Sequence, residues 1–177
     1  MAKITTIIDI GSNSMRMVVF KKSSRFGFHL INETKSKVKI SEGCYENNGN
    51  LQDIPLQRAY NALKSFLQIA KNSKSRKILC VATSALRDAP NGKDFVKKIS
   101  KELGLNIKVI DGTREAYYGG IAALNLLPQK SFVTVDIGGG STEFSFVHEK
   151  KIEETVSLKI GTVRMHELYF KNDDLDS

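Results

Sequence analysis

Apolar and polar residues follow one another along this chain in blocks that predict a definite order of strands and helices. Three segments rich in β-branched and aromatic residues come first and are typical of consecutive strands: Ile4–Ile10, Met15–Lys21 and about His29–Ile40. After a polar loop over Ser41–Pro55, apolar residues recur every three or four positions in Leu56–Lys71, which predicts an amphipathic helix. Alternating elements follow: strand Lys77–Thr83, helix Lys93–Leu103, strand Ile107–Ile110 and helix Gly112–Leu127. The order βββαβαβα predicts an α/β domain whose mixed sheet has helices on both faces.

One phrase occurs twice in the sequence. Ile8–Ser14 reads IDIGSNS and Val135–Ser141 reads VDIGGGS, and aligning Asp9 with Asp136 extends the match into the apolar stretches that follow. Each copy is typical of a strand, a tight turn and a return strand. Small residues in such a turn let backbone N–H groups and hydroxyls converge on an anion, because no bulky side chain keeps a phosphate away. The repeat favours two phosphate-binding turns over two ordinary hairpins.

The candidate phosphate ligands are the residues of these two turns and two arginines. The turn residues are Gly11, Ser12, Asn13 and Ser14 in the first copy, and Gly138, Gly139, Gly140, Ser141 and Thr142 in the second. Arg16 stands at the repeat position of Glu143, and Arg87 follows a strand and a small-residue turn. A guanidinium at either place can reach phosphate oxygens, and each arginine is equally compatible with a surface position.

Acidic residues near the turns are candidates for metal binding and catalysis. Asp136 ends one strand of the second copy and Glu143 lies on the return strand, so a hairpin can bring both carboxylates to one edge, where hard oxygen ligands suit Mg²⁺. Asp9 is the equivalent of Asp136 in the first copy. Glu115 falls in the first turn of a predicted helix, where the helix dipole alone would favour an acid.

The sequence predicts a first domain over residues 1–127 and an incomplete second copy over residues 128–177. After the second turn, Lys151–Leu158 is typical of a third strand and Gly161–Phe170 of a first helix, and the sequence then ends. Either the chain is a fragment of a longer protein or a partner supplies the missing half. Open strand edges also invite pairing with another chain, including a second copy in a homodimer.

Composition narrows the class of protein further. With 41% hydrophobic residues there is no apolar run of the ~20 residues that span a bilayer, and no signal-peptide pattern. Cys44 and Cys80 lack metal or redox spacing, so we expect free thiols in a reducing cytoplasm. The net charge of +8 is compatible with a solvated lysine surface and with steering of a polyanion. Because no basic stretch is interleaved with aromatic residues, we do not expect nucleic-acid binding.

Four motifs carry a resemblance to a known family: Asp9–Ser14, Ala82–Arg87, Gly112–Ala116 and Asp136–Glu143. In their order and spacing the chain resembles the exopolyphosphatase and guanosine pentaphosphate phosphohydrolase (Ppx/GppA) family. That family is part of the acetate and sugar kinase, Hsp70 and actin superfamily. The resemblance implies an actin-like (ribonuclease H-like) fold, with two such domains that face each other across a phosphate-binding cleft.

The resemblance also implies roles for individual residues. The glutamate that matches Glu115 is the family's catalytic base, the acids that match Asp136 and Glu143 bind the metal or orient water, and the arginine that matches Arg87 contacts phosphate. The implied reaction releases terminal phosphate from polyphosphate, or from guanosine penta- or tetraphosphate as in the stringent response, with Mg²⁺ or another divalent cation. Arg114 departs from the family, which usually has an acid there. A kinase-type phosphotransferase and a non-catalytic binder of these anions remain open alternatives.

Overall fold

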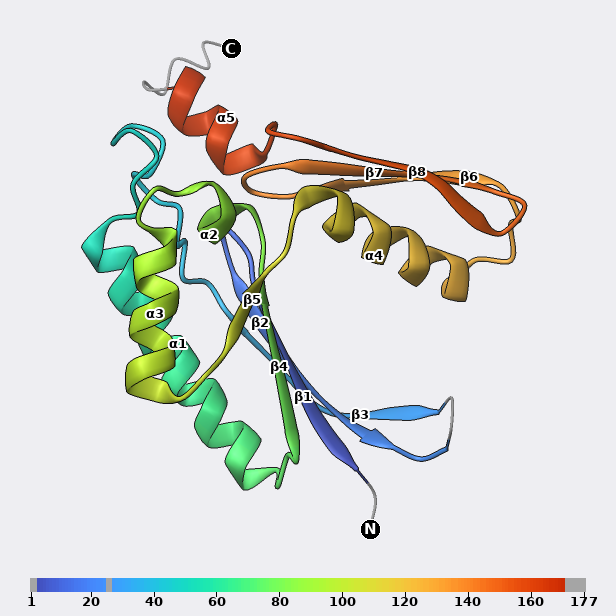
Figure 1. Ribbon diagram of the computed structural model, residues 1–177, viewed down its shortest axis with the longest axis horizontal. Coiled ribbons are helices and arrows are strands. Elements are labelled where there is room, and N and C mark those ends of the chain that lie inside the picture. Colours follow the sequence, from blue (N-terminus) through green and yellow to red (C-terminus); the bar gives the residue numbers. More distant parts are fainter. Residues whose placement is uncertain (1–2, 25–26, 171–177) are drawn as a thin grey trace, which may run out of the picture. The chain divides into compact units, whose positions relative to one another are not determined.

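The chain folds into two compact units, Met1–Val109 and Ile110–Ser177, of which the computed structural model describes residues 3–24 and 27–170 (Figure 1). The first unit contains β1 (Ile4–Ile10), β2 (Met15–Lys22), β3 (Phe28–Ser36), α1 (Asp53–Asn72), β4 (Lys77–Ala82), α2 (Ser84–Asp88), α3 (Gly92–Leu103) and β5 (Ile107–Val109). The second contains α4 (Gly112–Leu126), β6 (Phe132–Ile137), β7 (Thr142–His148), β8 (Lys151–Leu158) and α5 (Thr162–Tyr169). Apart from the short helix α2, the predicted order of elements is confirmed. None of the helices in the described part of the chain is long and apolar enough to cross a membrane.

The first unit is built on a mixed five-stranded sheet with the order β3-β2-β1-β4-β5. β1 pairs with β2, and β2 with β3, in antiparallel fashion, while β4 and β5 extend the sheet in parallel. The antiparallel pairs need only short connections, and the parallel ones need crossover helices. The carboxyl ends of the neighbouring strands β1 and β4 therefore meet at the same edge of the sheet, and the first repeated turn lies at that edge.

Buried residues alternate with more exposed ones along β1 and β2, and the buried ones form the core of this unit. Ile8 and Ile10 on β1, and Met17 on β2, are 0% exposed and form one cluster with Phe66 of α1 and Phe95 of α3. Since alternate strand residues share a face, α1 and α3 lie on the same side of the sheet, as Figure 1 shows. The prediction of helices on both faces is wrong for this unit, because both of its crossover helices pack on the face that carries Ile8.

Two element boundaries differ from the predicted ones by more than one residue. The strand expected to reach about Ile40 ends at Ser36, and the chain then forms turns. The helix expected to begin at Leu56 begins at Asp53, so Pro55 lies in its first turn. Proline is tolerated there, because the first N–H groups of a helix have no partner within the helix. The connection between these two elements therefore covers residues 37–52 instead of the expected 41–55.

The second unit is a three-stranded antiparallel sheet, β6-β7-β8, with α4 packed against all three strands. Small residues allow this close packing: the Ser145 hydroxyl donates to the carbonyl of Ala116 at 2.5 Å, and Gly120 faces Ser145 and Ile152. The sequence placed this helix in the first domain, with a boundary at residues 127 and 128. In the structure α4 packs on the second sheet, so the boundary lies between Val109 and Ile110.

The face of the second sheet opposite α4 is apolar and exposed. Val133, Val135 and Ile137 are 52%, 56% and 65% exposed. In the repeat, Val135 and Ile137 correspond to Ile8 and Ile10, which are fully buried beneath helices in the first unit. Over residues 110–170, the second copy therefore has the strand pattern of the first without a layer of helices on this face.

Adjacent glycines on α4 provide a matched test of this packing. A Cβ on Gly120 would lie 2.9 Å from Ile152 Cδ1 and 3.0 Å from Ser145 Cβ, whereas a Cβ on Gly119 meets nothing within 4 Å. We expect Gly120→Ala to lower the free energy of unfolding by roughly 1–2 kcal/mol through overpacking. Gly119→Ala should raise it by about 0.5–1 kcal/mol through helix propensity. Urea unfolding measures the free energy of unfolding of both variants. Equal changes in the two variants would contradict the described packing of α4 on the second sheet.

Candidate active site

The two repeated turns have the same backbone hydrogen bond. The N–H of Gly11 donates to the carbonyl of Ser14 at 3.2 Å, and the N–H of Gly138 donates to that of Ser141 at 2.9 Å. A Cβ on either glycine would lie 3.1 Å from the accepting carbonyl oxygen, so the tight turn favours glycine at both places. The sequence repeat is therefore also a repeat of local structure.

The first turn is supported from behind by the segment that follows β3. The N–H of Lys39 donates to the carbonyl of Asn13 at 2.8 Å, and the N–H of Ser41 donates to the carbonyl of Ser12 at 3.1 Å. The described peptide bonds are trans, and a trans peptide directs its C=O and N–H to opposite sides. The N–H groups of Asn13 and Ser14 therefore point away from the supporting segment, as an anion-binding turn requires.

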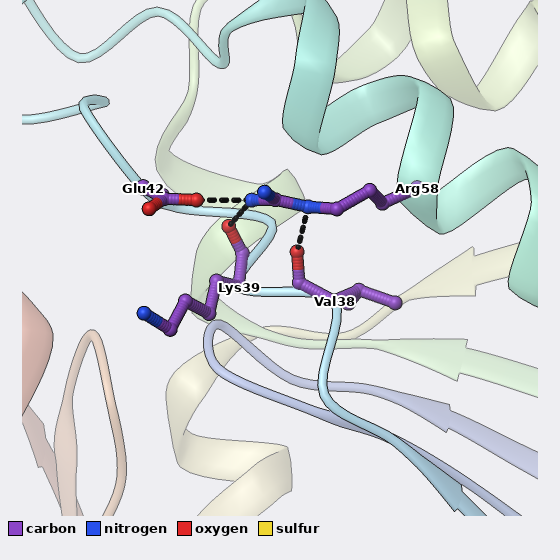
Figure 2. Close-up of polar contacts among 4 residues, drawn as sticks. All are labelled: Val38, Lys39, Glu42 and Arg58. Atoms are coloured by element: carbon purple, nitrogen blue, oxygen red, sulfur yellow. Dashed lines mark hydrogen bonds and ion pairs between the residues drawn. The ribbon is translucent and has the colours of Figure 1, made fainter.

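Arg58 of α1 anchors this supporting segment, as Figure 2 shows. Its Nε donates to the carbonyl of Val38 at 2.9 Å, and its Nη2 donates to the carbonyl of Lys39 at 3.5 Å and pairs with Glu42. The hydrogen bond from Arg58 holds the pKa of Glu42 below its usual value. Helix α1 thus stabilises the first turn indirectly, by holding the segment after β3 that donates hydrogen bonds to the turn.

A buried pair of hydroxyls joins the first turn to α2. The Oγ atoms of Ser12 and Ser84 lie 3.0 Å apart, and both side chains are buried. Ser84 is the first residue of α2, and Arg87 follows one helical turn later with a side chain that is 19% exposed and lies 3.5 Å from Asp88. The structure therefore brings the helix of Arg87 to the first turn, and Arg87 stays a predicted phosphate ligand.

Asp9 and Arg16 are direct cross-strand partners beside the first turn. Such partners project from the same face of an antiparallel pair. Arg16 also forms an ion pair with Glu33 of β3, with 2.6 Å between its Nη2 and Oε1 of the glutamate. Both side chains of this ion pair are well exposed, so we expect the pair to be weak. Arg16 stays a predicted phosphate ligand.

The second turn is supported by the start of α5 instead of by a loop. Backbone N–H groups of Thr162 and Val163 donate to the carbonyls of Gly138 and Gly139, each at 2.9 Å. Gly161 allows this approach, since a Cβ there would lie 2.5 Å from backbone atoms of Gly139 and Gly140. The turn therefore rests directly on helix backbone.

Asp136 and Glu143 are direct partners in the β6–β7 register, as their spacing predicted. Glu143 is only 4% exposed, and its Oε1 accepts a hydrogen bond from the hydroxyl of Ser157 at 2.7 Å, whereas Asp136 is exposed. The two carboxylates share the sheet face that α4 covers. The pair can offer oxygen ligands to a cation, although within residues 3–24 and 27–170 no cluster of three or more His, Cys, Asp or Glu side chains forms a metal site.

Glu115 lies in the first turn of α4, on the same face of the second sheet. Its backbone N–H donates to the carbonyl of Asp111, and the Asp111 carboxylate caps the helix by accepting from the N–H of Arg114 at 2.7 Å. The contact between Ala116 and Ser145 places this helix start two residues along β7 from Glu143. Glu115, Asp136 and Glu143 thus belong to one unit and one sheet face.

Five supporting residues were not predicted from the sequence. They are the hydroxyl partners and anchors of the turns and acids: Arg58, Ser84, Asp111, Ser157 and Arg164. Only the role of Asp111 could have been predicted from the local sequence, because an aspartate before a helical run is a preferred N-cap. The others act on residues that are distant in sequence.

These features define an α/β protein with a duplicated strand-turn-strand suited to phosphate and with three acids beside the second copy. The family model of the Ppx/GppA phosphatase family matches residues 18–177. A bifunctional 3-dehydroquinate synthase/phosphatase from Fusobacterium nucleatum is 34% identical over an aligned region that covers 95% of this chain and 26% of the relative.

Two solved structures are similar over nearly the whole chain. The Aquifex aeolicus member of the Ppx/GppA family is 30% identical with a TM-score of 0.80, and the match covers 97% of this chain and 56% of that one. An exopolyphosphatase from Cytophaga hutchinsonii is 27% identical with a TM-score of 0.86, over 94% and 54%.

The chain belongs to the Ppx/GppA phosphatase family. The actin-like α/β fold expected for that family is confirmed. The chain spans about half the length of the solved structures that it matches and about a quarter of the curated relative.

The cap that precedes Glu115 gives a prediction about pH. The hydroxyl of Thr113 and the N–H of Arg114 hold the pKa of Asp111 below its usual value of 3.8. A lowered pKa means that the folded state favours the ionised form. The stabilisation is therefore present above pH 3.8 and is lost as pH falls through the lower folded-state value. A carboxyl NMR titration should show this shift, and Thr113→Val should move the Asp111 value back toward 3.8. A wild-type Asp111 that titrates normally would show that this cap is not formed.

Proposed function

We propose that this protein is a phosphohydrolase that releases terminal orthophosphate from inorganic polyphosphate or from guanosine penta- or tetraphosphate. The observation that carries the proposal is the second unit, which holds a phosphate-type turn and three carboxylates, Glu115, Asp136 and Glu143, on one sheet face. Phosphoanhydride cleavage needs an in-line water, a group that takes its proton, and donors on the phosphoryl oxygens. The residues described above include candidates for the proton acceptor and for the donors to the phosphoryl oxygens.

The turns would supply the donors. Residues Gly11–Ser14 and Gly138–Thr142 offer amide and hydroxyl groups, and the supporting hydrogen bonds direct several of those amides away from the protein behind them. Arg87, held on the helix that Ser84 ties to the first turn, would supply a forked cation for the terminal phosphate. Both proposed substrates present such a phosphate, so this part of the site would serve either one.

Glu115 would position and deprotonate the attacking water. It lies at the amino end of α4, where the helix dipole favours a negative charge, and its helix is capped by Asp111. Its neighbour Ala116 is tied to β7 by Ser145, so the helix start is held against the sheet. A rigid first turn favours a defined base position.

A divalent cation is compatible with the acids of the second unit. Asp136 and Glu143 present oxygen ligands from adjacent strands, and Ser157 orients Glu143. Mg²⁺ commonly takes one or two carboxylates together with water and phosphate oxygens, which fits a pair of acids. When bound, the cation would neutralise charge on the phosphate chain. Asp9 of the first unit stays a further candidate ligand.

Phosphate release distinguishes this proposal from its rivals. A kinase-type phosphotransferase needs an acceptor substrate, whereas a hydrolase releases orthophosphate in water alone. A non-catalytic binder would retain polyphosphate or guanosine pentaphosphate without turnover. Assaying the full-length protein with each substrate and Mg²⁺, without any acceptor, decides among the three and also measures the preference between the two anions.

The first test of the mechanism is Glu115→Gln, which keeps the shape of the side chain and removes the base. We expect kcat for phosphate release to fall by about a hundredfold or more, with substrate affinity nearly unchanged. Glu153→Gln, at an exposed position of β8, is the matched control and should behave as wild type. Retention of most of the turnover by Glu115→Gln would exclude Glu115 as the base.

The second test concerns the cation. Asp136→Asn and Glu143→Gln should each raise the Mg²⁺ concentration for half-maximal activity by about tenfold, and Ser157→Ala should raise it less, because Ser157 orients a ligand. Asp94→Asn, on the exposed side of α3, is the control. A metal titration at constant substrate measures the shift. Unchanged titrations in both carboxylate variants would remove the pair from the site.

A further inference from the structure

Arg164 contacts the second turn with both its backbone and its side chain. Its N–H donates to the carbonyl of Gly139 at 3.0 Å, and its Nε donates to the carbonyl of Gly140 at 2.8 Å. With the bonds from Thr162 and Val163, three successive carbonyls of the turn are bound to α5. The first two are held by helix backbone, and the third is held by a side chain.

The third carbonyl decides where the N–H of Ser141 points. Gly140 and Ser141 share a peptide, and a trans peptide directs its N–H opposite to its C=O. With the Gly140 carbonyl on Arg164, the N–H of Ser141 is directed away from α5, as are those of Gly139 and Gly140. Glycine tolerates many backbone conformations, so sequence alone does not select this orientation at Gly140.

The structure assigns Arg164 the role of a positioning residue: its Nε holds the Gly140–Ser141 peptide so that the N–H of Ser141 faces bound phosphate. The assignment rests on the proposed function of the second turn as a phosphate site. It concerns a hydrogen bond to a carbonyl, and not attraction between the guanidinium and the substrate.

The first unit contains a counterpart of this device. Arg58 lies on α1, which follows β3 as α5 follows β8, and its Nε also donates to a backbone carbonyl, that of Val38. There the guanidinium holds the segment that supports the turn (Figure 2). Both copies thus use an arginine Nε from the helix after the third strand to fix main-chain carbonyls.

Three variants separate the hydrogen bond from the charge. Gln places its Nε2 the same number of bonds from Cα as the Nε of Arg, so Arg164→Gln keeps a donor there and loses the charge. Arg164→Met loses both. Arg76→Met is the control for net charge, because it removes an exposed arginine that is remote from the first turn. The backbone N–H of Arg76 donates to the carbonyl of Ile4, at the opposite end of β1 from that turn.

The measurements are tripolyphosphate binding by calorimetry in the presence of Mg²⁺, and the NMR order parameter of the Ser141 amide without ligand. We expect Arg164→Met to weaken binding about tenfold, the scale of one lost hydrogen bond. Its Ser141 order parameter should fall from about 0.85 to below about 0.6. Arg164→Gln should stay within about threefold of wild type, and Arg76→Met should match wild type.

Each other outcome counts against one specific claim. If Arg164→Gln binds as poorly as Arg164→Met while Ser141 stays ordered in both, the charge acts directly and the positioning role is overturned. Normal binding and normal order in Arg164→Met would also overturn it. If the wild-type protein does not bind tripolyphosphate, the proposed function fails, and the order parameter of Ser141 still decides whether Arg164 holds the turn.

Discussion

The direction of a few peptide planes governs each of the two candidate phosphate-binding turns. A turn can present N–H groups to an anion only if its carbonyls are directed elsewhere, because a trans peptide points the two to opposite sides. Buried or crowded carbonyls need donors, so each turn depends on the element that lies behind it. The segment after β3 provides those donors in the first unit, and the start of α5 provides them in the second.

The two copies meet this requirement in different ways. Both turns share the bond from the first glycine to the serine carbonyl, but the first is backed by a loop that Arg58 anchors and the second by helix backbone and Arg164. The glycine-rich second turn has less conformational preference of its own, and it has the more direct support. A duplicated motif can thus keep its turn geometry while its surroundings diverge.

Strand register places the acids. Asp136 and Glu143 face each other because β6 and β7 pair with one definite register, and a slip of one residue would send one carboxylate to the opposite face. The apolar alternation of these strands resists such a slip, since it would exchange apolar and polar positions. The same register brings Glu143 to Ser157 on β8, so one antiparallel sheet pairs the two carboxylates and orients that of Glu143.

Much of this protein was predictable from local sequence. The order of strands and helices, the repeated turn and the pairing of Asp136 with Glu143 follow from periodicity and from short hairpins, which are local properties.

The position of α4 was not predictable, because the amphipathic pattern of a helix does not say which sheet it will cover. Gly120 and Ser145 decide that by close packing. Arg58, Ser84 and Arg164 were missed for the same reason: each binds a group brought near only by tertiary folding. The sequence by itself determined the two repeated turns and predicted that they bind phosphate. The tertiary structure decided which way their amides point, because that direction depends on donors supplied by other segments of the chain.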